Sequence, residues 1–485
     1  MKSTTSNGSF ARLFADYGML LVLLLLGVFF SAATLEEQHP AGAAGARQLA
    51  RDISRQFPPG ASVLIAVRDT VEDAEFAREL GTRLEAAGLV VTETVNGQPA
   101  DIRRVLTRIA AGQDQLAVIA ANQTTASWAV LQDAATDFPA LARAKLVWPR
   151  SYRWPNFLKA DNLLNIANQI AVIAIVAIGM TLVIITAGID LSVGSLIALS
   201  AVVCTLFIRN LAGAEHAAAA GMVWCSLAAV GVCGVVGLFS GAMVTLFAIP
   251  PFITTLAMML VASGLAFIVA QGQSIYQVPD SFIWLGRGSS LGLPNAVLLM
   301  LVLYAAAHFV MTRTVLGRYL YAVGGNAEAA RLSGVPVKKV LLFAYTASGA
   351  LAGLGGIVMA SQLKSGSPTY GQMYELYVIA AVVVGGASLS GGEGKVLGTL
   401  IGAFIIAVIQ NGMNLTGVES YTQKVVLGLV ILGAVLLDIL KRRGWQWLRR
   451  ERVSSSQEAP HAADRPSNGR PFDPDKERGS SRSNQ

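Results

Sequence analysis

Long apolar runs, each close to the roughly 20 residues that cross a bilayer as a helix, make up most of the chain after residue 162. Another run lies near the N-terminus, at about 17–33, and follows Lys2 and Arg12. No clean small-residue cleavage site stands apart from it, so we interpret it as an uncleaved first helix. The pattern predicts a mainly α fold, a polytopic membrane bundle of about ten transmembrane helices. The nine later runs cover about 163–187, 191–211, 221–248, 252–271, 294–312, 340–363, 376–389, 396–415 and 425–440.

Between residues 35 and 156 the pattern changes to short apolar runs that alternate with amphipathic segments. This alternation predicts βαβ units, and therefore a small parallel sheet covered on both faces. Ligands of such sheets bind beyond the carboxyl ends of the strands, here at Arg68, Asp69 and Thr70 and at 122–125. Polar loop residues are usual at these places, so a structural role is the more common one. The strand-like runs are 62–67, 89–95, 116–121 and 144–148, and the helical patterns are 71–87, 100–111 and 124–135.

A polar interval of more than twenty residues, 317–340, separates two of the apolar runs. Its lysines and arginines favour the cytoplasmic side of the membrane, because short loops rich in these residues stay inside. Asn326 is a good helix cap, residues 327–332 are good helix formers, and Gly334 can end the helix. The sequence thus predicts a short helix on the inner face of the membrane, which a partner could bind. The alternative is an ordinary loop helix.

A second basic cluster follows the last apolar run. With an even number of helices it places both termini in the cytoplasm and the α/β insertion outside. The polar residues beyond it have no apolar surface to bury and predict a disordered tail. The basic residues are Lys441, Arg442, Arg443, Arg449, Arg450 and Arg452. The predicted parts are an N-terminal segment with the first helix (1–34), an inserted α/β extracytoplasmic domain (35–156), a transmembrane core (157–443) and the cytoplasmic tail (444–485).

The composition excludes several classes of function. The chain is 53% hydrophobic and 14% charged, too apolar for an ordinary soluble enzyme, and its net charge of +7 comes from helix ends and the tail, so no nucleic-acid partner is expected. The three cysteines lie in apolar runs and the four histidines are scattered, so no metal site is predicted. Residues 389–393, LSGGE, resemble an ATPase signature, and GEGK, ending at Lys395, resembles the end of a phosphate loop. A phosphate loop would need Gly where Leu389 stands and a hydroxyl where Val396 stands, so neither motif predicts nucleotide hydrolysis by this chain.

Five stretches in order resemble the permease subunits of ABC importers for ribose, xylose, galactose and similar sugars. The resemblance runs from about residue 156 to 438 and includes the first helix. It implies a multi-pass inner (plasma) membrane protein that forms the translocation pathway for a sugar or similar small polar solute. It also implies a separate ABC ATPase subunit, an extracytoplasmic solute-binding protein and a homodimer or pseudo-dimer of permeases, with no enzyme activity or cofactor in this chain. The stretches are 178–201, 249–266, 317–335, 367–403 and 411–423.

The sequence offers residues for two sites, of which the resemblance implies the first. The inner-face helix would be the loop that couples to the ATPase, and polar residues between the apolar runs are candidates for the translocation pathway. Asp190 is either a functional residue, since ionisable groups are rare between apolar runs, or the cap of the next helix. The coupling residues are Gly325, Asn326, Glu328, Ala329, Ala330, Arg331 and Gly334, and the pathway candidates are Asp190, Ser192, Glu375, Asn411 and Asn414.

Two departures from the family leave alternatives open. The family continues its Tyr-Glu-Leu motif with Asp-Ala, whereas Tyr377 and Val378 follow here, which leaves the identity of the solute open. The α/β insertion replaces a short link, and its element order resembles part of one lobe of a sugar-binding protein. It could be a tethered receptor fragment, a docking platform or a spacer. A membrane-anchored sensor with a ligand-binding α/β domain is the alternative function, although no cytosolic output domain is evident.

Overall fold

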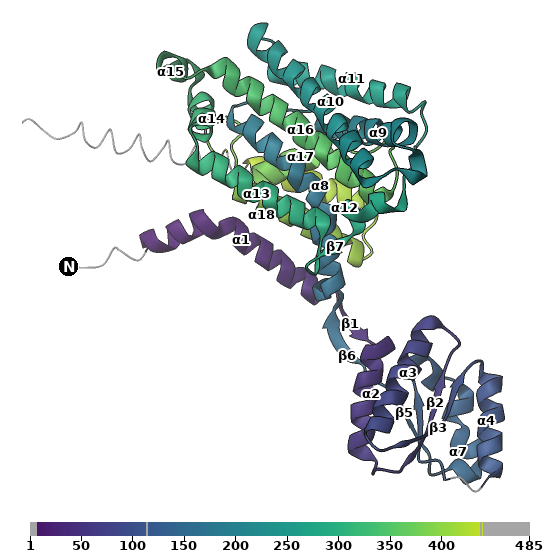
Figure 1. Cartoon of the computed structure of the whole chain (residues 1–485). Helices are drawn as coiled ribbons and strands as arrows, with labels where there is room; N and C mark the ends of the chain where they lie inside the picture. Colours follow the sequence, from purple (N-terminus) through teal and green to yellow (C-terminus); the bar gives the residue numbers. More distant parts are fainter. Residues whose placement is uncertain (1–6, 113–114, 437–438, 440–485) are drawn as a thin grey trace, which may run out of the picture. The chain divides into compact units, whose positions relative to one another are not determined.

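The computed structural model describes residues 7–112, 115–436 and 439 (Figure 1). Within these residues, seven helices are long and apolar enough to cross a membrane. All seven lie at positions where the sequence predicts a span, and their ends differ from the prediction by only a few residues. They are α8 (Ala160–Ile185), α9 (Val193–Leu211), α10 (Ala219–Leu246), α11 (Pro251–Val269), α13 (Asn295–Arg313), α16 (Val337–Leu363) and α18 (Val396–Leu415).

The other three predicted spans are also helical, but their apolar parts are shorter. In α1 (Asn7–Ala33) the apolar part of the described helix is Gly18–Ala33, and a further apolar helix covers Ser420–Leu436. Helix α17 (Tyr374–Val384) has 11 residues, which at 1.5 Å per residue cannot cross a bilayer core of about 30 Å. The polytopic bundle is therefore established for seven helices. The basic cluster 441–452 and the predicted tail 444–485 lie outside the described residues.

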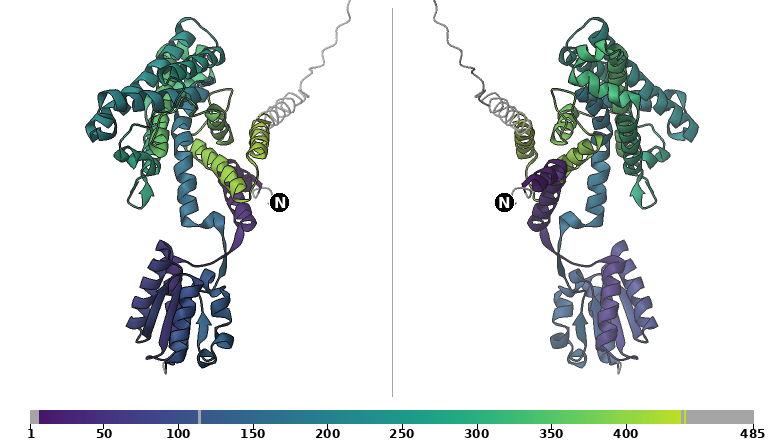
Figure 2. Two further views of the ribbon diagram at one scale, coloured as in Figure 1. Left: turned by 90° about the vertical axis from the view of Figure 1, so that its right-hand side faces the viewer. Right: turned by 90° about the vertical axis from the view of Figure 1, so that its left-hand side faces the viewer.

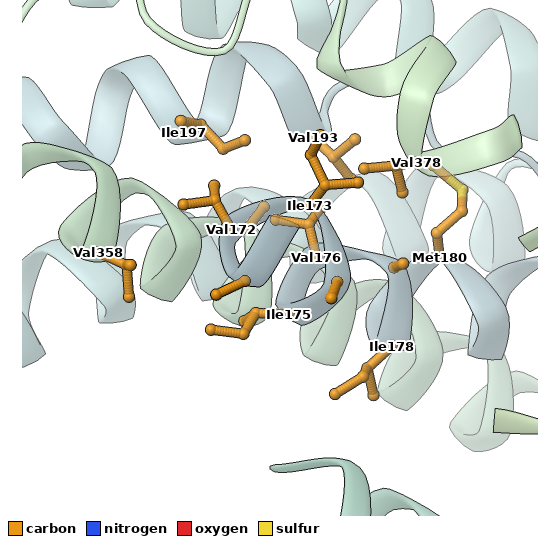
Figure 3. Packing of buried hydrophobic residues seen from close by; sticks show 14 of the residues in the cluster. Val172, Ile173, Ile175, Val176, Ile178, Met180, Val193, Ile197, Val358 and Val378 are labelled. Atoms are coloured by element: carbon orange, nitrogen blue, oxygen red, sulfur yellow. The ribbon is translucent and has the colours of Figure 1, made fainter. Parts of the chain in front are cut away.

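Helix α8 lies at the centre of the bundle and contacts α13, α16, α17 and α18. Its valines and isoleucines are buried almost throughout, as Val172, Ile175 and Val176 illustrate (Figure 3). Because lipid tails are as apolar as these side chains, close packing rather than water exclusion stabilises such contacts. Helices α10 and α16 approach through glycine: a Cβ atom on Gly349 would lie 2.4 Å from the carbonyl oxygen of Cys233.

Short elements join the long helices at their ends. Between α11 and α13 lie η4 (Asp280–Ile283), α12 (Trp284–Arg287) and the small strands β7 (Ser289–Ser290) and β8 (Leu293–Pro294). Between α9 and α10 lies η3 (Ala214–His216). The polar interval 317–340 contains α14 (Val315–Gly325) and α15 (Ala327–Leu332). The short helix that the sequence predicts at 327–332 is thus present with the same bounds.

A two-stranded antiparallel ribbon joins the insertion to the helices on either side of it. Strand β1 (Leu35–Gln38) begins two residues after α1 ends, and β6 (Tyr152–Pro155) leads through η2 (Asn156–Leu158) into α8. The N–H of Asn156 donates to the carbonyl oxygen of Thr34 (2.9 Å), so the two chain ends of the insertion meet at one point.

The insertion itself has four parallel strands in the order β3-β2-β4-β5. Helices α2 and α3 form one buried core against the sheet, and α4 with the short helices after β4 forms another, which gives three layers (Figure 2). The four strands lie where the sequence predicts them. Their bounds and those of the covering elements are α2 (Gly42–Gln56), β2 (Ser62–Val67), α3 (Val71–Ala86), β3 (Val90–Asn96), α4 (Pro99–Ala111), β4 (Val118–Ala121), α5 (Gln123–Ala126), α6 (Ala129–Gln132), α7 (Ala134–Asp137), η1 (Pro139–Leu141) and β5 (Lys145–Val147).

Two helical details differ from the sequence pattern. The single helix predicted at 124–135 is broken into α5, α6 and α7. Trp128, in an extended conformation (φ −73°, ψ 131°), separates α5 from α6, and Asp133 (φ −91°, ψ 6°) separates α6 from α7. Helix α2 lies before the first predicted helix, and its buried Leu49 and Ile53 face the sheet.

The polar residues at the strand ends are mostly bound to one another. Arg68 Nε donates to the buried carboxylate of Asp73 (2.8 Å), and Asn122 caps α5 by accepting from the N–H of Thr125 (2.8 Å). Burial raises the pKa of Asp73, but hydrogen bonds from Arg68 and Asn122 outweigh this and hold its pKa below the ordinary value. The arrangement favours the structural role for these residues over ligand binding.

Residues 40–150 expressed alone should fold and melt cooperatively, because both cores of the insertion lie within them. Since the folded-state pKa of Asp73 is lowered, its stabilising contribution is complete above about pH 5 and is lost as the pH falls through the folded pKa. Circular dichroism melts should show Asp73→Asn lowering stability at neutral pH by about 1–3 kcal/mol and flattening the acid dependence. Glu85→Gln, on the exposed side of α3, is the control. A disordered spectrum would contradict an independent domain.

Candidate coupling and translocation sites

Helix α15, which the sequence predicts on the inner face of the membrane, is stabilised at both of its ends. The side chain of Asn326 accepts a hydrogen bond from the N–H of Ala329 (2.9 Å), which is the predicted cap. At the other end Gly334 has φ +83°, a left-handed conformation that residues with a Cβ rarely adopt. The N–H of Val335 then donates to the carbonyl oxygen of Ala330 (3.0 Å) and closes the helix. The local sequence therefore fixes this helix without outside help.

Six of the seven predicted coupling residues are exposed on or beside α15. Glu328 and Arg331 form an exposed ion pair (3.1 Å), which organises one side of the helix. Ala330 differs from the expectation: it is only 5% exposed and packs into the core of the chain itself. Leu332, which the family pattern does not single out, is a large apolar side chain that is 76% exposed. The surface of α15 that a partner could contact thus centres on Ala329 and Leu332.

The loop between α17 and α18 lies against the end of α8 and against α14, the helix that precedes α15. The N–H of Gly392 donates to the carbonyl oxygen of Ile185 at the end of α8 (2.8 Å), and Tyr321 of α14 donates to the carbonyl oxygen of Gly394 (2.7 Å). Gly391 and Gly392 have φ values of +82° and +75°. The glycines of the LSGGE stretch therefore serve tight backbone packing between the end of α8 and α14, in agreement with rejecting this stretch as a nucleotide loop.

Asp190 lies in the turn between α8 and α9 and is 1% exposed. One carboxyl oxygen accepts from the N–H (3.0 Å) and the Oγ (2.6 Å) of Ser192, and the other accepts from Oγ of Ser348 in α16 (2.8 Å). The carboxyl group thus holds the turn before α9, whereas the N-cap of α9 is Ser192, whose side chain makes no capping hydrogen bond. The carboxyl group also ties that turn to α16, the helix that follows the coupling element.

Further polar groups gather around this turn. A Cβ atom on Gly188 would lie 2.4 Å from the hydroxyl oxygen of Tyr345, which is buried and has no hydrogen-bond partner among the described residues. On the other side, a Cβ atom on Gly194 would lie 2.3 Å from a carboxyl oxygen of Glu375, the second residue of α17. Three of the five pathway candidates, Asp190, Ser192 and Glu375, are therefore brought to one region of the bundle.

The two asparagine candidates lie elsewhere, near the end of α18. The side chains of Asn411 and Asn162 exchange two hydrogen bonds (2.9 and 3.0 Å) and join α18 to the start of α8. Asn414 accepts from Gln423 (2.8 Å). These amides are satisfied by helix-to-helix ties, and they do not meet Asp190. Among the described residues, no group of three or more His, Cys, Asp or Glu side chains could hold a metal ion.

Residues 162–435 match the family described as the permease component of branched-chain amino acid transport systems. The chain belongs to this family. It is 44% identical over 292 residues to the ribose import permease protein of Escherichia coli K12, a match that covers 59% of this chain and 88% of that protein. It is 42% identical to the ribose import permease protein of Bacillus subtilis (59% and 86%) and 36% identical to the D-allose transport system permease protein of Escherichia coli K12 (59% and 85%). No solved structure matches.

Family membership makes this chain a membrane permease subunit and not an enzyme, as the five motif stretches predict. It does not support the alternative of a membrane-anchored sensor. The coupling element, the Asp190 turn and the asparagine ties all lie within the matched residues. The insertion at 35–156 lies before them, so its role is not given by the family.

Proposed function

We propose that this permease forms the pathway for a monosaccharide in an ATP-driven importer, energised by a separate ATPase and supplied by an extracytoplasmic binding protein. The observation that carries the proposal is the 44% identity to a ribose import permease across most of that protein's length. A relative named as an L-arabinose ABC transporter permease, 35% identical, supports the same class of solute. Cells or vesicles that contain the complete importer should accumulate D-ribose, D-allose or L-arabinose when ATP is present. Failure with all three would overturn the sugar assignment.

Within this function, the exposed face of α15 is proposed as the contact with the ATPase. The ends of the helix are formed by Gly325, Asn326 and Gly334. Its exposed surface carries Glu328, Ala329 and Arg331. Ala330 supports the helix from beneath. Leu332 supplies the large apolar side chain that a partner's cleft would bury, since such anchors provide much of the affinity of interfaces.

The region around Asp190 is proposed as part of the translocation pathway, closed in this conformation. Polar side chains of the α8–α9 turn, α16 and α17 converge there, and sugars are bound through hydrogen bonds to just such groups. Ser192 and Glu375 would contact the solute once the hydrogen bond between Asp190 and Ser348 has broken. Asn411 and Asn414 are proposed to hold the end of α18 rather than to contact solute.

The proposed topology has ten transmembrane helices, with both termini in the cytoplasm of the inner membrane and the α/β insertion outside. The Lys and Arg residues flanking α14 and α15 support it, because such residues mark cytoplasmic loops. The half-length α17 would form only part of its crossing, and the loop after it, which bonds to the end of α8 through Gly392, would complete the crossing to the inner side. Two permease chains, identical or similar, would form the complete pathway.

Cysteine labelling should test this topology. A cysteine at Ser127 should react with an impermeant thiol reagent added outside intact cells, whereas one at Ser333 should react only after the cells are opened. Both positions are exposed, and the three native cysteines are buried, so background labelling should be low. Labelling at Ser333 from outside would contradict the ten-helix topology.

A further inference from the structure

Helix α2 of the insertion carries three arginines that form no ion pair with any residue the structure describes. Arg47, Arg51 and Arg55 are four residues apart, so they lie along one side of the helix, and all three are exposed. None lies within ion-pair distance of a carboxylate in the described part of the chain, and Asp52 on the same helix pairs with Arg150 (3.5 Å). Like charges at this spacing repel one another, so the chain retains an arrangement that costs stability.

Helix α4 of the same domain shows that the fold can pair its arginines. Arg103, Arg104 and Arg108 are also exposed, yet each contacts a carboxylate, of Asp137 (3.0 Å), Asp101 and Glu93 (3.2 Å) respectively. Two helices of similar length and equal arginine number thus differ in whether their charge is neutralised within the chain. Because the positive charge of the three α2 arginines is not neutralised within the described part of the chain, these side chains are available to bind an anionic group outside it.

A cavity of about 360 Å³ lies beside these arginines. Arg51 and Arg55 line it together with Gln48 and Asp52 from α2 and Tyr152 from the ribbon, and the carboxylate of Asp52 is paired with Arg150. Gln48 donates to the backbone oxygen of Arg150 (3.1 Å), which holds the ribbon against α2. The cavity thus combines two guanidinium groups, which bind phosphate oxygens in pairs, with one aromatic ring.

The ribbon ties this site to the membrane surface. The end of the ribbon next to α1 is held in place, because the N–H of Phe157 donates to the hydroxyl of Thr34 (3.1 Å). Four residue pairs of strand extend only about 13 Å, about twice the thickness of one headgroup layer. Tyr152 and Trp154, on one face of β6, are 53% and 46% exposed, and exposed Trp and Tyr are typical of the membrane interface.

We propose that the α2 arginines and this cavity bind the phosphate headgroup of an anionic phospholipid. In the topology proposed above, the lipid belongs to the outer leaflet of the inner membrane. Binding would hold the α/β domain against the bilayer and restrain rotation about its ribbon. Glu36 and Glu37 of β1 are not among the residues that line the cavity, and they accept hydrogen bonds from Asn156 and Ser151 respectively.

Photocrosslinking of the full-length chain tests the proposal. A benzophenone side chain in place of Ala44, an exposed residue that lines the cavity, is illuminated in bilayers of phosphatidylcholine with or without phosphatidylglycerol. Lipid adducts on the peptide containing residue 44 should increase by roughly tenfold when phosphatidylglycerol is present. The increase should shrink at high salt, because exposed charges are screened.

Two charge variants give the matched comparison. Arg47→Gln, Arg51→Gln and Arg55→Gln together should remove the increase, whereas Arg103→Gln, Arg104→Gln and Arg108→Gln together should leave it intact. A benzophenone at Thr107 of α4 should form few adducts in either bilayer. Equal adducts with and without phosphatidylglycerol, or crosslinks to protein in place of lipid, would overturn the proposal. ATP-dependent uptake is measured in parallel, so that failure of the lipid site and failure of the importer function are told apart.

Discussion

Leu332→Asp should abolish both retention of the ATPase subunit and uptake of solute. Leu332 is 76% exposed at the end of α15, so its replacement leaves the packing of the permease unchanged. In a complex, the aspartate would be buried in an apolar contact without a partner, at a cost of several kcal/mol. Copurification of the two subunits from detergent and uptake by intact cells measure the effect.

Leu332→Met is the conservative control and should keep most of both activities, because methionine fills a cleft nearly as well as leucine. Ala330→Glu should behave differently from Leu332→Asp: it would bury a charge within the permease itself and reduce the amount of folded protein. If Leu332→Asp copurifies with the ATPase and transports at the normal rate, α15 is not the contact.

Asp190→Ala should destabilise the bundle and stop transport. It would leave the N–H of Ser192 and the hydroxyls of Ser192 and Ser348 without their acceptor in a buried place. Each buried donor left unsatisfied costs about 1–3 kcal/mol, so a loss of about 3 kcal/mol or more is expected. Thermal denaturation of the purified chain in detergent, followed by the rise in reactivity of its buried cysteines, should show the shift.

Asp190→Asn separates the role of the residue in the turn from its role in transport. Asparagine retains an acceptor for the N–H of Ser192, so this variant should fold close to normally. If Asp190 also takes part in translocation, Asp190→Asn should still lose uptake while the ATPase is retained. Normal uptake by Asp190→Asn would assign the residue to the turn alone. Ser348→Ala, which removes the tie to α16 only, should cost less stability than Asp190→Ala.

The long helices could be predicted from the sequence because their signal is local. A run of about twenty apolar residues has few alternatives to a membrane helix, and the cap at Asn326 and the turn at Gly334 are equally local. The spacing of Leu49, Ala50 and Ile53 carries the same kind of signal for α2. The break at Trp128 lacks such a signal, because no glycine or proline marks it.

The grouping of the site residues could not be read from local patterns. Asp190 and Ser348 are 158 positions apart in the chain, and Asn162 and Asn411 are 249 apart. A polar residue in an apolar run shows only that a partner is needed, and the partner is chosen by the packing of the helices. For the same reason the sequence did not distinguish Ala329 from Ala330, which differ only in the side of α15 on which they lie.

The hydrogen bond between Asn156 and Thr34 has a consequence for how this chain could have arisen. Because the insertion leaves the membrane part and returns to it at a single point, its removal would bring together two ends that already touch. Such a module can be gained or lost by one genetic event without moving a single membrane helix. The same geometry allows it to be exchanged for a fluorescent protein or an affinity handle, with the transporter beneath it left intact.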